Sequence, residues 1–223
     1  QERVRDINEI THCFYYAYNE NYCLALSHDE VVHEKASLLS KMPGKDEQMI
    51  GNLKLLYALM FAHPGKKLLF MGAEIGQWNE WNHEAELDWS LLRYKRHQGI
   101  YQWLKDVNSL YRNEPALYEQ DFNALGLEWL DFSQKGSGVI AFIRKSLAHE
   151  RMLVVLNFSH HKKSKHRIGV MHKENWKEVL NSDDKKYGGK NVKNIKIIKA
   201  QKRSSHARMY SISVTVPAFG AVF

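Results

Sequence analysis

YCLALSHDE, residues 22–30, decides the fold: a short apolar run is followed at once by three ionisable side chains. A second short apolar run, KLLFM at residues 67–71, is followed by the glycine-flanked segment GAEIG at residues 72–76. Short apolar runs bounded by polar residues or glycine are typical of buried strands. Helical patterns lie between and after the two runs. The order strand, helix, strand, helix predicts parallel pairing through right-handed crossovers.

Two amphipathic helices are predicted from apolar residues spaced three and four apart. The first would carry Met49, Leu53, Leu56 and Met60. The second would carry Ile100, Leu104, Val107 and Tyr111. Asp46 is a candidate N-cap for the first helix, and His63-Pro64-Gly65 would end it. An earlier helix is expected to end at residues 14–18.

The pattern changes after Asn113-Glu114-Pro115, where strand-like runs separated by turn residues take over. These runs are residues 127–132, 139–144, 152–158 and 211–216. The last of them alternates polar and apolar residues, which indicates a strand with one face in water. We therefore expect a small antiparallel β-sandwich from about residue 114, so that the fold class is α/β followed by all-β.

Composition indicates an ordinary globular protein: of 223 residues, 44% are hydrophobic and 26% are charged. No apolar run is long enough to span a membrane, and Cys13 and Cys23 are too few for a disulfide framework, so we expect a cytoplasmic protein. The net charge of +7 is concentrated in residues 160–167 and 185–203, which we expect to be solvated loops. Neither nucleic acid nor a membrane is expected as a partner.

The triplet His28, Asp29 and Glu30 is the first candidate site. Loops at the carboxyl ends of parallel strands build the active sites of α/β folds, and this triplet directly follows a predicted strand. A structural alternative is equally consistent with the pattern, because Ser27 or Asp29 could cap a following helix. A metal site is a third alternative. However, His28 and His33 are five residues apart, which would turn their side chains about 140° apart on a helix.

The loop after the second strand is the other candidate site. Glu74 would lie at the same edge as Asp29. Its flanking glycines, Gly72 and Gly76, suggest a phosphate-binding turn, but the lysine of a P-loop and the third glycine of a dinucleotide site are missing. Trp78 and Trp81 lie among polar residues, a combination suited to stacking on sugar rings. Both could instead pack the loop against the domain.

Several different short motifs occur along the chain, some of them within these runs. In chain order they are LSHDEVVH (26–33), KMPG (41–44), HPGKKLLFMG (63–72), GQW (76–78), EWN (80–82), LDW (87–89), EPAL (114–117), VV (154–155), NF (157–158), NSD (181–183) and YGG (187–189). Together they resemble the glycogen (1,4-alpha-glucan) branching enzymes of the alpha-amylase superfamily, over nearly the whole chain.

The resemblance implies that residues 1–113 are the last part of a (β/α)8 TIM barrel, with its seventh and eighth strands, and that residues 114–223 are the family's all-β C-terminal domain. The family cleaves an α-1,4 link, holds the severed chain as a covalent glycosyl-enzyme and transfers it to a 6-hydroxyl, which is retaining chemistry. Its nucleophile and acid/base lie on the fourth and fifth strands, which would precede Gln1. We therefore expect an inactive C-terminal fragment of a glycosyltransferase.

The resemblance also assigns roles. Asp29 matches the family's third carboxylate and would stabilise the transition state, while His28 would contact hydroxyls of the same sugar. Glu30, Glu74 and Trp78 are expected to bind substrate at the mouth. The partner would be an alpha-glucan, with no metal and no cofactor. Glu34 and Ala73 stand where the family pattern leads us to expect glycine.

Two other functions remain open. The parent could be another alpha-amylase-superfamily glycoside hydrolase, although the segments KMPG and GQW speak against it. Alternatively the chain could be a non-catalytic glucan-binding module that uses its tryptophan loop. Because two strands of a barrel cannot close, we expect exposed apolar strand faces and self-association of the isolated chain.

Overall fold

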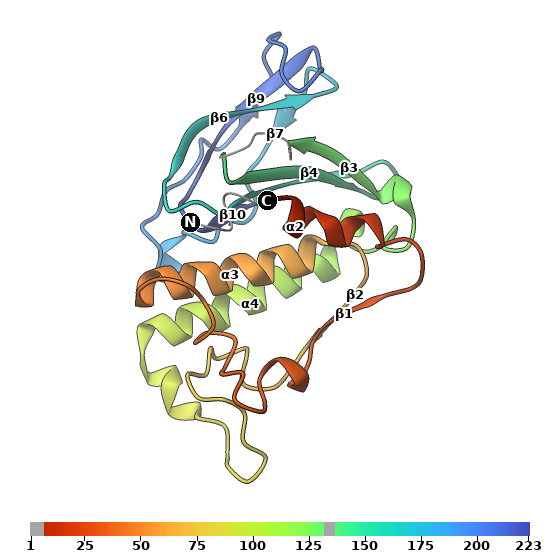
Figure 1. Ribbon diagram of the computed structural model, residues 1–223. Coiled ribbons are helices and arrows are strands. Elements are labelled where there is room, and N and C mark those ends of the chain that lie inside the picture. The colour runs from red at the N-terminus through yellow and green to blue at the C-terminus, as the bar shows by residue number, and fades with distance from the viewer. Residues whose placement is uncertain (1–6, 132–136) are drawn as a thin grey trace.

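The strands β1 (Cys23–Leu26) and β2 (Lys66–Leu69) pair in parallel, with Cys23 opposite Lys66 and Leu26 opposite Leu69. The helix α3 (Asp46–Ala62) connects them, and α4 (Lys95–Asn113) follows β2. This computed structural model describes residues 7–131 and 137–223 (Figure 1). The predicted order of strand, helix, strand and helix and its parallel pairing are therefore confirmed.

Shorter elements surround this unit. They are the helix α2 (Ile7–His12) and the 3-10 turns η1 (Cys13–Tyr15), η2 (His28–Glu30), η3 (Trp89–Arg93), η4 (Pro115–Leu117), η5 (Ala124–Gly126) and η6 (Lys185–Tyr187). The start of the predicted barrel part, at Gln1, lies outside the described residues.

The helix α3 is buried on most of its circumference rather than on one stripe. Leu53 and Met60 of the predicted stripe are buried, but Leu55 and Tyr57 on other faces are buried as well. Figure 1 shows the reason, because α3 lies between α4 and the β-sheet of the second half. The N-cap is Lys45 and not Asp46, which is the first helical residue and suits that place because an acidic side chain favours the first turn of a helix.

The second half is built from antiparallel strands. They are β3 (Leu127–Asp131), β4 (Val139–Lys145), β5 (Arg151–Asn157), β6 (Lys163–Val170), β7 (Asn175–Trp176), β8 (Ile198–Lys199), β9 (Tyr210–Val216) and β10 (Gly220–Val222). The larger sheet has the order β10-β5-β4-β3, β6 pairs with β9, and β7 pairs with β8. The expected strands are confirmed, except that Phe132 lies outside the described residues.

The larger sheet is shared by two cores. On β4, Ile140 and Phe142 face the cluster that includes α3, whereas Val139, Ala141 and Ile143 face the cluster that includes β6 and β9. A strand buried on both faces needs apolar residues at every position, which explains the continuous run on β4. On β9 mainly one face is buried, so its sequence alternates.

One loop prediction is wrong. Residues 160–167 were expected to be a solvated loop, yet most of them belong to β6, which pairs with β9 from Arg167 opposite Ser213 to Val170 opposite Tyr210. Ile168 and Val170 anchor this strand in the core, while its lysines stay at the exposed end. Lysines of this kind protect sheet edges from unwanted pairing. Residues 185–203 are mostly loop, as expected, and include η6 and β8.

A loop at residues 181–192 joins the two halves. Lys54 of α3 donates from Nζ to the main-chain oxygens of Ser182 (2.8 Å) and Tyr187 (3.2 Å). The Tyr187 hydroxyl donates to Asp106 of α4 at 2.6 Å. A side chain at Gly99 of α4 would place its Cβ 2.7 Å from the Tyr187 oxygen, so only glycine allows this approach. The segments NSD and YGG therefore hold the β-domain against the helices.

One face of the β1–β2 pair is open. Leu24, Leu26 and Leu69 pack on the core, whereas the alternate residues, including Ala25 and Leu68, are exposed. Within the described ranges, 7–131 and 137–223, no helix combines the length and the apolar character needed to span a membrane.

Candidate functional site

The triplet after β1 forms the short turn η2, and Ser27 caps it. The Ser27 hydroxyl oxygen accepts a hydrogen bond from the backbone N–H of Asp29 at 3.3 Å. Ser27 therefore fills the capping role, and the Asp29 side chain is left 71% exposed. The capping role that the sequence left open between Ser27 and Asp29 therefore belongs to Ser27.

His28 and Asp29 lie side by side at the carboxyl end of β1. Nε2 of His28 is 3.3 Å from Oδ1 of Asp29, and the His28 side chain is 56% exposed. The His28 ring also lies 5.9 Å from the ring of Phe70, which follows β2. Lys35 donates from Nζ to the Asp29 main-chain oxygen at 2.6 Å. The pair is thus open to solvent while the main chain beneath it is held.

Glu30 is engaged with Lys41. The Lys41 ammonium lies 3.6 Å from Oε2 of Glu30 and also donates to the Glu30 main-chain oxygen. This pairing orients Glu30 within its own loop. Among the three ionisable residues of the turn, it leaves His28 and Asp29 as the pair best placed to meet a ligand.

Trp78 is anchored by its indole edge. Nε1 of Trp78 donates to Nε2 of His97 at 3.2 Å, and Nδ1 of the buried His97 lies 2.9 Å from the Ile75 oxygen. His97 therefore carries its proton on Nδ1 and accepts through Nε2. The Ser40 hydroxyl donates to the Trp78 oxygen at 2.6 Å. These contacts support the packing role that the sequence left open for this residue.

Glu74 lies beside the buried Tyr57. The Tyr57 hydroxyl donates to the Ala73 oxygen at 2.6 Å. Burial raises the pKa of the Tyr57 hydroxyl, and the negative charge of Glu74 raises it further. Glu74 itself is half-buried in the loop after β2.

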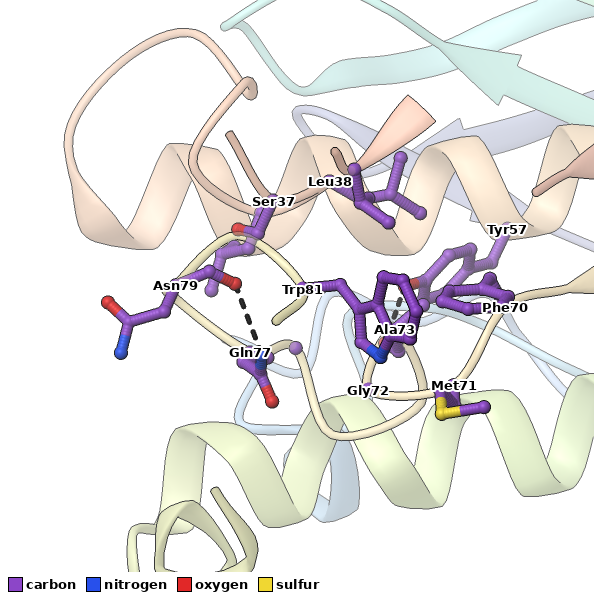
Figure 2. A pocket seen from close by; sticks show the side chains of 13 residues that line it. Ser37, Leu38, Tyr57, Phe70, Met71, Gly72, Ala73, Gln77, Asn79 and Trp81 are labelled. Atoms are coloured by element: carbon purple, nitrogen blue, oxygen red, sulfur yellow. Dashed lines mark hydrogen bonds between the residues drawn. The ribbon is translucent and has the colours of Figure 1, made fainter. Parts of the chain in front are cut away.

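A narrow cavity separates the two loops (Figure 2). Phe70 and Trp81 line it with their rings 5.0 Å apart and nearly perpendicular, and Tyr57 closes another side. Its volume of about 20 Å³ admits about one water molecule, so a sugar ring does not fit inside. A glucan would have to bind at the open surface beside it. Across the part of the chain that the structure describes, no three His, Cys, Asp or Glu side chains are grouped to hold a metal ion.

The contacts of three side chains in the site were not foreseen from sequence. Glu80 accepts hydrogen bonds from the backbone N–H groups of Glu34 (3.0 Å) and Ala36 (2.8 Å), and Lys35 and Lys41 hold the turn η2. The two lysines follow the triplet closely and could have been suspected from charge alone. Nothing in the spacing indicates that Glu80 reaches back more than 40 residues.

Comparison with known proteins agrees with the fold. Residues 129–223 match the family model described as "Alpha amylase, C-terminal all-beta domain", which confirms the expected type of the second half. The structure resembles a debranching enzyme from Nostoc punctiforme, with a TM-score of 0.57 at 15% identity, covering 90% of this chain and 34% of that one. It also resembles a pullulanase complexed with maltotetraose from an Anoxybacillus species, with a TM-score of 0.54 at 15% identity, covering 80% of this chain and 24% of that one.

Sequence comparison is more specific. The chain is 47% identical over 215 residues to a 1,4-alpha-glucan branching enzyme of Pseudomonas putida, covering 96% of the chain and 29% of that protein. It is 46% identical over 215 residues to the 1,4-alpha-glucan branching enzyme of Aquifex aeolicus, covering 96% of the chain and 34% of that protein. The chain therefore spans about a third or less of the length of these relatives.

Proposed function

We propose that this chain is part of a 1,4-alpha-glucan branching enzyme, to which it is similar over 96% of its length, and that the whole protein cleaves α-1,4 links in a glucan and transfers the severed chain to a 6-hydroxyl. The observation that carries this proposal is the exposed pair His28 and Asp29 at the carboxyl end of a parallel strand, facing the loop that follows the next strand. This is the edge at which barrel enzymes build their sites.

We further propose that β1 and β2 are the seventh and eighth strands of a (β/α)8 barrel, with the domain boundary between residues 113 and 114. Two features support this arrangement. The strands pair in parallel through α3, and the alternate residues that face away from the helices are exposed, as expected where the barrel interior lacks its other strands. The end of α4 at Asn113 fits the proposed boundary.

In this proposal Asp29 stabilises the transition state. As positive charge develops on the sugar ring, hydrogen bonds from its hydroxyls to a carboxylate become stronger. His28, adjacent to that carboxylate, would contact hydroxyls of the same sugar. Glu30, Glu74 and Trp78 would support binding at the mouth. The anchored indole edge of Trp78 leaves only its ring face for contact with substrate.

The reacting carboxyl groups would come from outside this chain. Retaining chemistry requires a nucleophile and an acid/base whose carboxyl groups are about 5 Å apart. We assign both to the part of the relatives that this chain does not span, which is more than half of their length. The isolated chain would then be inactive but would still bind alpha-glucan weakly. We propose that the full-length enzyme is cytoplasmic.

Product analysis tests the proposal. The isolated chain and the full-length protein would each be incubated with amylose, and new α-1,6 ends and free reducing sugar would be measured separately. We expect α-1,6 ends from the full-length protein and none above background from the chain. Free sugar without branches would instead identify a hydrolase. Branch formation by the chain alone would contradict the assignment of the missing carboxyl groups.

The binding-module alternative needs a different experiment. Glycogen pull-down with the chain and with its Trp78→Ala and Trp81→Ala variants measures how far the tryptophan loop contributes to binding. If both variants bind as the unchanged chain does, the loop is not a glucan-binding surface and this alternative loses its basis.

A further inference from the structure

The turn at residues 33–36 has an unusual backbone. His33, Glu34 and Ala36 have φ angles of 56°, 64° and 62°, in the left-handed region that favours glycine. None of them is glycine, and each such residue is strained by contact between its Cβ and the following carbonyl oxygen. A turn of this kind persists only when its surroundings hold it in place.

The carboxylate of Glu80 supplies that hold. Its Oε1 accepts from the N–H of Glu34 at 3.0 Å, and its Oε2 accepts from the N–H of Ala36 at 2.8 Å. Backbone N–H groups that converge in left-handed turns form a concave site for an anion, and here the anion is a side chain of the protein. Both carboxylate oxygens are therefore used to fix the turn.

The same turn carries a contact to the candidate catalytic residue. Lys35 lies between the two residues held by Glu80, and its Nζ donates to the Asp29 main-chain oxygen at 2.6 Å. The neighbouring Trp81 also donates from its backbone N–H to the Val31 oxygen at 3.0 Å. The loop after β2 therefore contacts the loop after β1 both within this turn and just before it.

We propose that Glu80 is a positioning residue of the reaction, because it fixes the turn at residues 33–36 and, through Lys35, the main chain at Asp29. The effect of Glu80 on catalysis rests on the branching function proposed above. Its effect on the turn at residues 33–36 does not depend on that function. Glu34 has a positive φ and is not glycine, so this turn needs the carboxylate more than a turn with glycine at that position would.

A rescue experiment in the full-length protein tests this directly. Glu80→Gln removes the charge and one acceptor and should lower kcat about tenfold to a hundredfold, with KM changed by less than about threefold, since small displacements of a catalytic group reduce turnover strongly. Adding Glu34→Gly, which adopts a positive φ without strain, should restore kcat by about threefold or more. A residue needed only for overall folding would not be rescued in this way.

Hydrogen exchange supplies a readout that does not depend on activity. In Glu80→Gln, exchange of the backbone amides at residues 31–41 should rise roughly tenfold while α3 stays protected. Glu84→Gln is the matched control in the same loop, because Glu84 is 80% exposed, and it should behave as wild type.

The outcomes separate the two proposals. Unchanged exchange at residues 31–41, or kcat within about twofold of wild type in Glu80→Gln, overturns the role of Glu80. Failure of Glu34→Gly to restore either quantity also overturns it. If wild type forms no branches, the branching proposal fails, and the exchange of residues 31–41 still decides whether Glu80 holds the turn.

Discussion

Arg144 of β4 donates a 2.8 Å hydrogen bond from Nη1 to the main-chain oxygen of Ala62, the last residue of α3. The carbonyl groups of the last helical turn have no partners within a helix, so the β-domain completes the end of α3. The same guanidinium pairs with Asp121 at 2.9 Å and donates to the Gly126 oxygen at 3.2 Å. Arg144 and Asp121 are both buried, so this contact belongs to the shared core of the two halves.

Arg144→Met should therefore destabilise the chain strongly. The substitution removes the partner of Oδ1 of the buried Asp121, while Lys66 and the Tyr111 hydroxyl still contact its Oδ2. The cost should therefore be about 3 kcal/mol, at the low end for a broken buried ion pair. Urea unfolding of the chain measures the change. Lys145→Met is the control, because Lys145 pairs with Glu128 near the surface, and it should cost less than about 1 kcal/mol. Equal losses of folding stability in the two variants would contradict the proposal that Arg144 stabilises the core shared by the two halves.

Acid should destabilise the fold through His63. Burial lowers the pKa of His63 to about 4, and none of the residues that the structure describes forms a hydrogen bond with its buried Nε2. Between pH 6.5 and 4 the unfolded chain binds a proton that the folded chain does not. Stability is therefore lost as the pH falls through this window, by about 2 kcal/mol at pH 5.

Urea unfolding at pH 7 and pH 5 tests the role of His63. His63→Gln cannot take up this proton. Its free energy of unfolding should therefore fall less between pH 7 and pH 5 than that of the unchanged chain, by about 2 kcal/mol. The same pH dependence in both proteins would show that other groups cause it.

Trp78→Phe should separate anchoring from sugar contact. The variant keeps an aromatic face but loses the donor to His97, leaving Nε2 of a buried histidine unpaired. We expect a loss of about 1–3 kcal/mol in stability and little change in the amount of glycogen bound. Trp89→Phe, at an exposed residue of the following turn, is the control for stability. A large fall in glycogen binding with unchanged stability would contradict the anchoring role.

The open strand face should drive self-association of the isolated chain. Leu68 in β2 and Met71, two residues after the end of that strand, are 42% and 51% exposed. Light scattering should show species larger than a monomer, and Leu68→Lys together with Met71→Lys should shift them towards monomer. A monodisperse monomer before any substitution would contradict this prediction.

The sequence predicts the elements of this chain better than their contacts. Apolar runs and spacings located β1, β2, α3, α4 and the main strands of the β-domain, because burial on a fixed face leaves a period in the sequence. The period of apolar residues did not predict that α3 is buried on most sides, since the β-domain that covers it comes later in the chain. The strand β6 was missed because lysines dominate its first residues. Its pairing with β9 is also irregular between Lys163 and His166, where Lys165 has a φ of 51°.

In the candidate site, too, the sequence predicted residues but not the contacts between them. His28 and Asp29 were located because ionisable residues directly after an apolar strand are conspicuous. The hold exerted by Glu80 on Glu34 and Ala36 was not foreseen, because a side chain that binds backbone N–H groups leaves no pattern in the residues that supply them. The glycine expected at residue 34 was the one available sign that the turn there has a positive φ.

The most direct test of the account is the number of α-1,6 branch points formed from amylose by the full-length protein and by its Asp29→Asn variant. The substitution keeps the size of the side chain and removes the charge that would stabilise the transition state. We predict branch formation by the wild type and a rate lower by at least about a hundredfold in the variant, with glucan affinity nearly retained. A variant that forms branches at close to the wild-type rate would contradict the role assigned to Asp29.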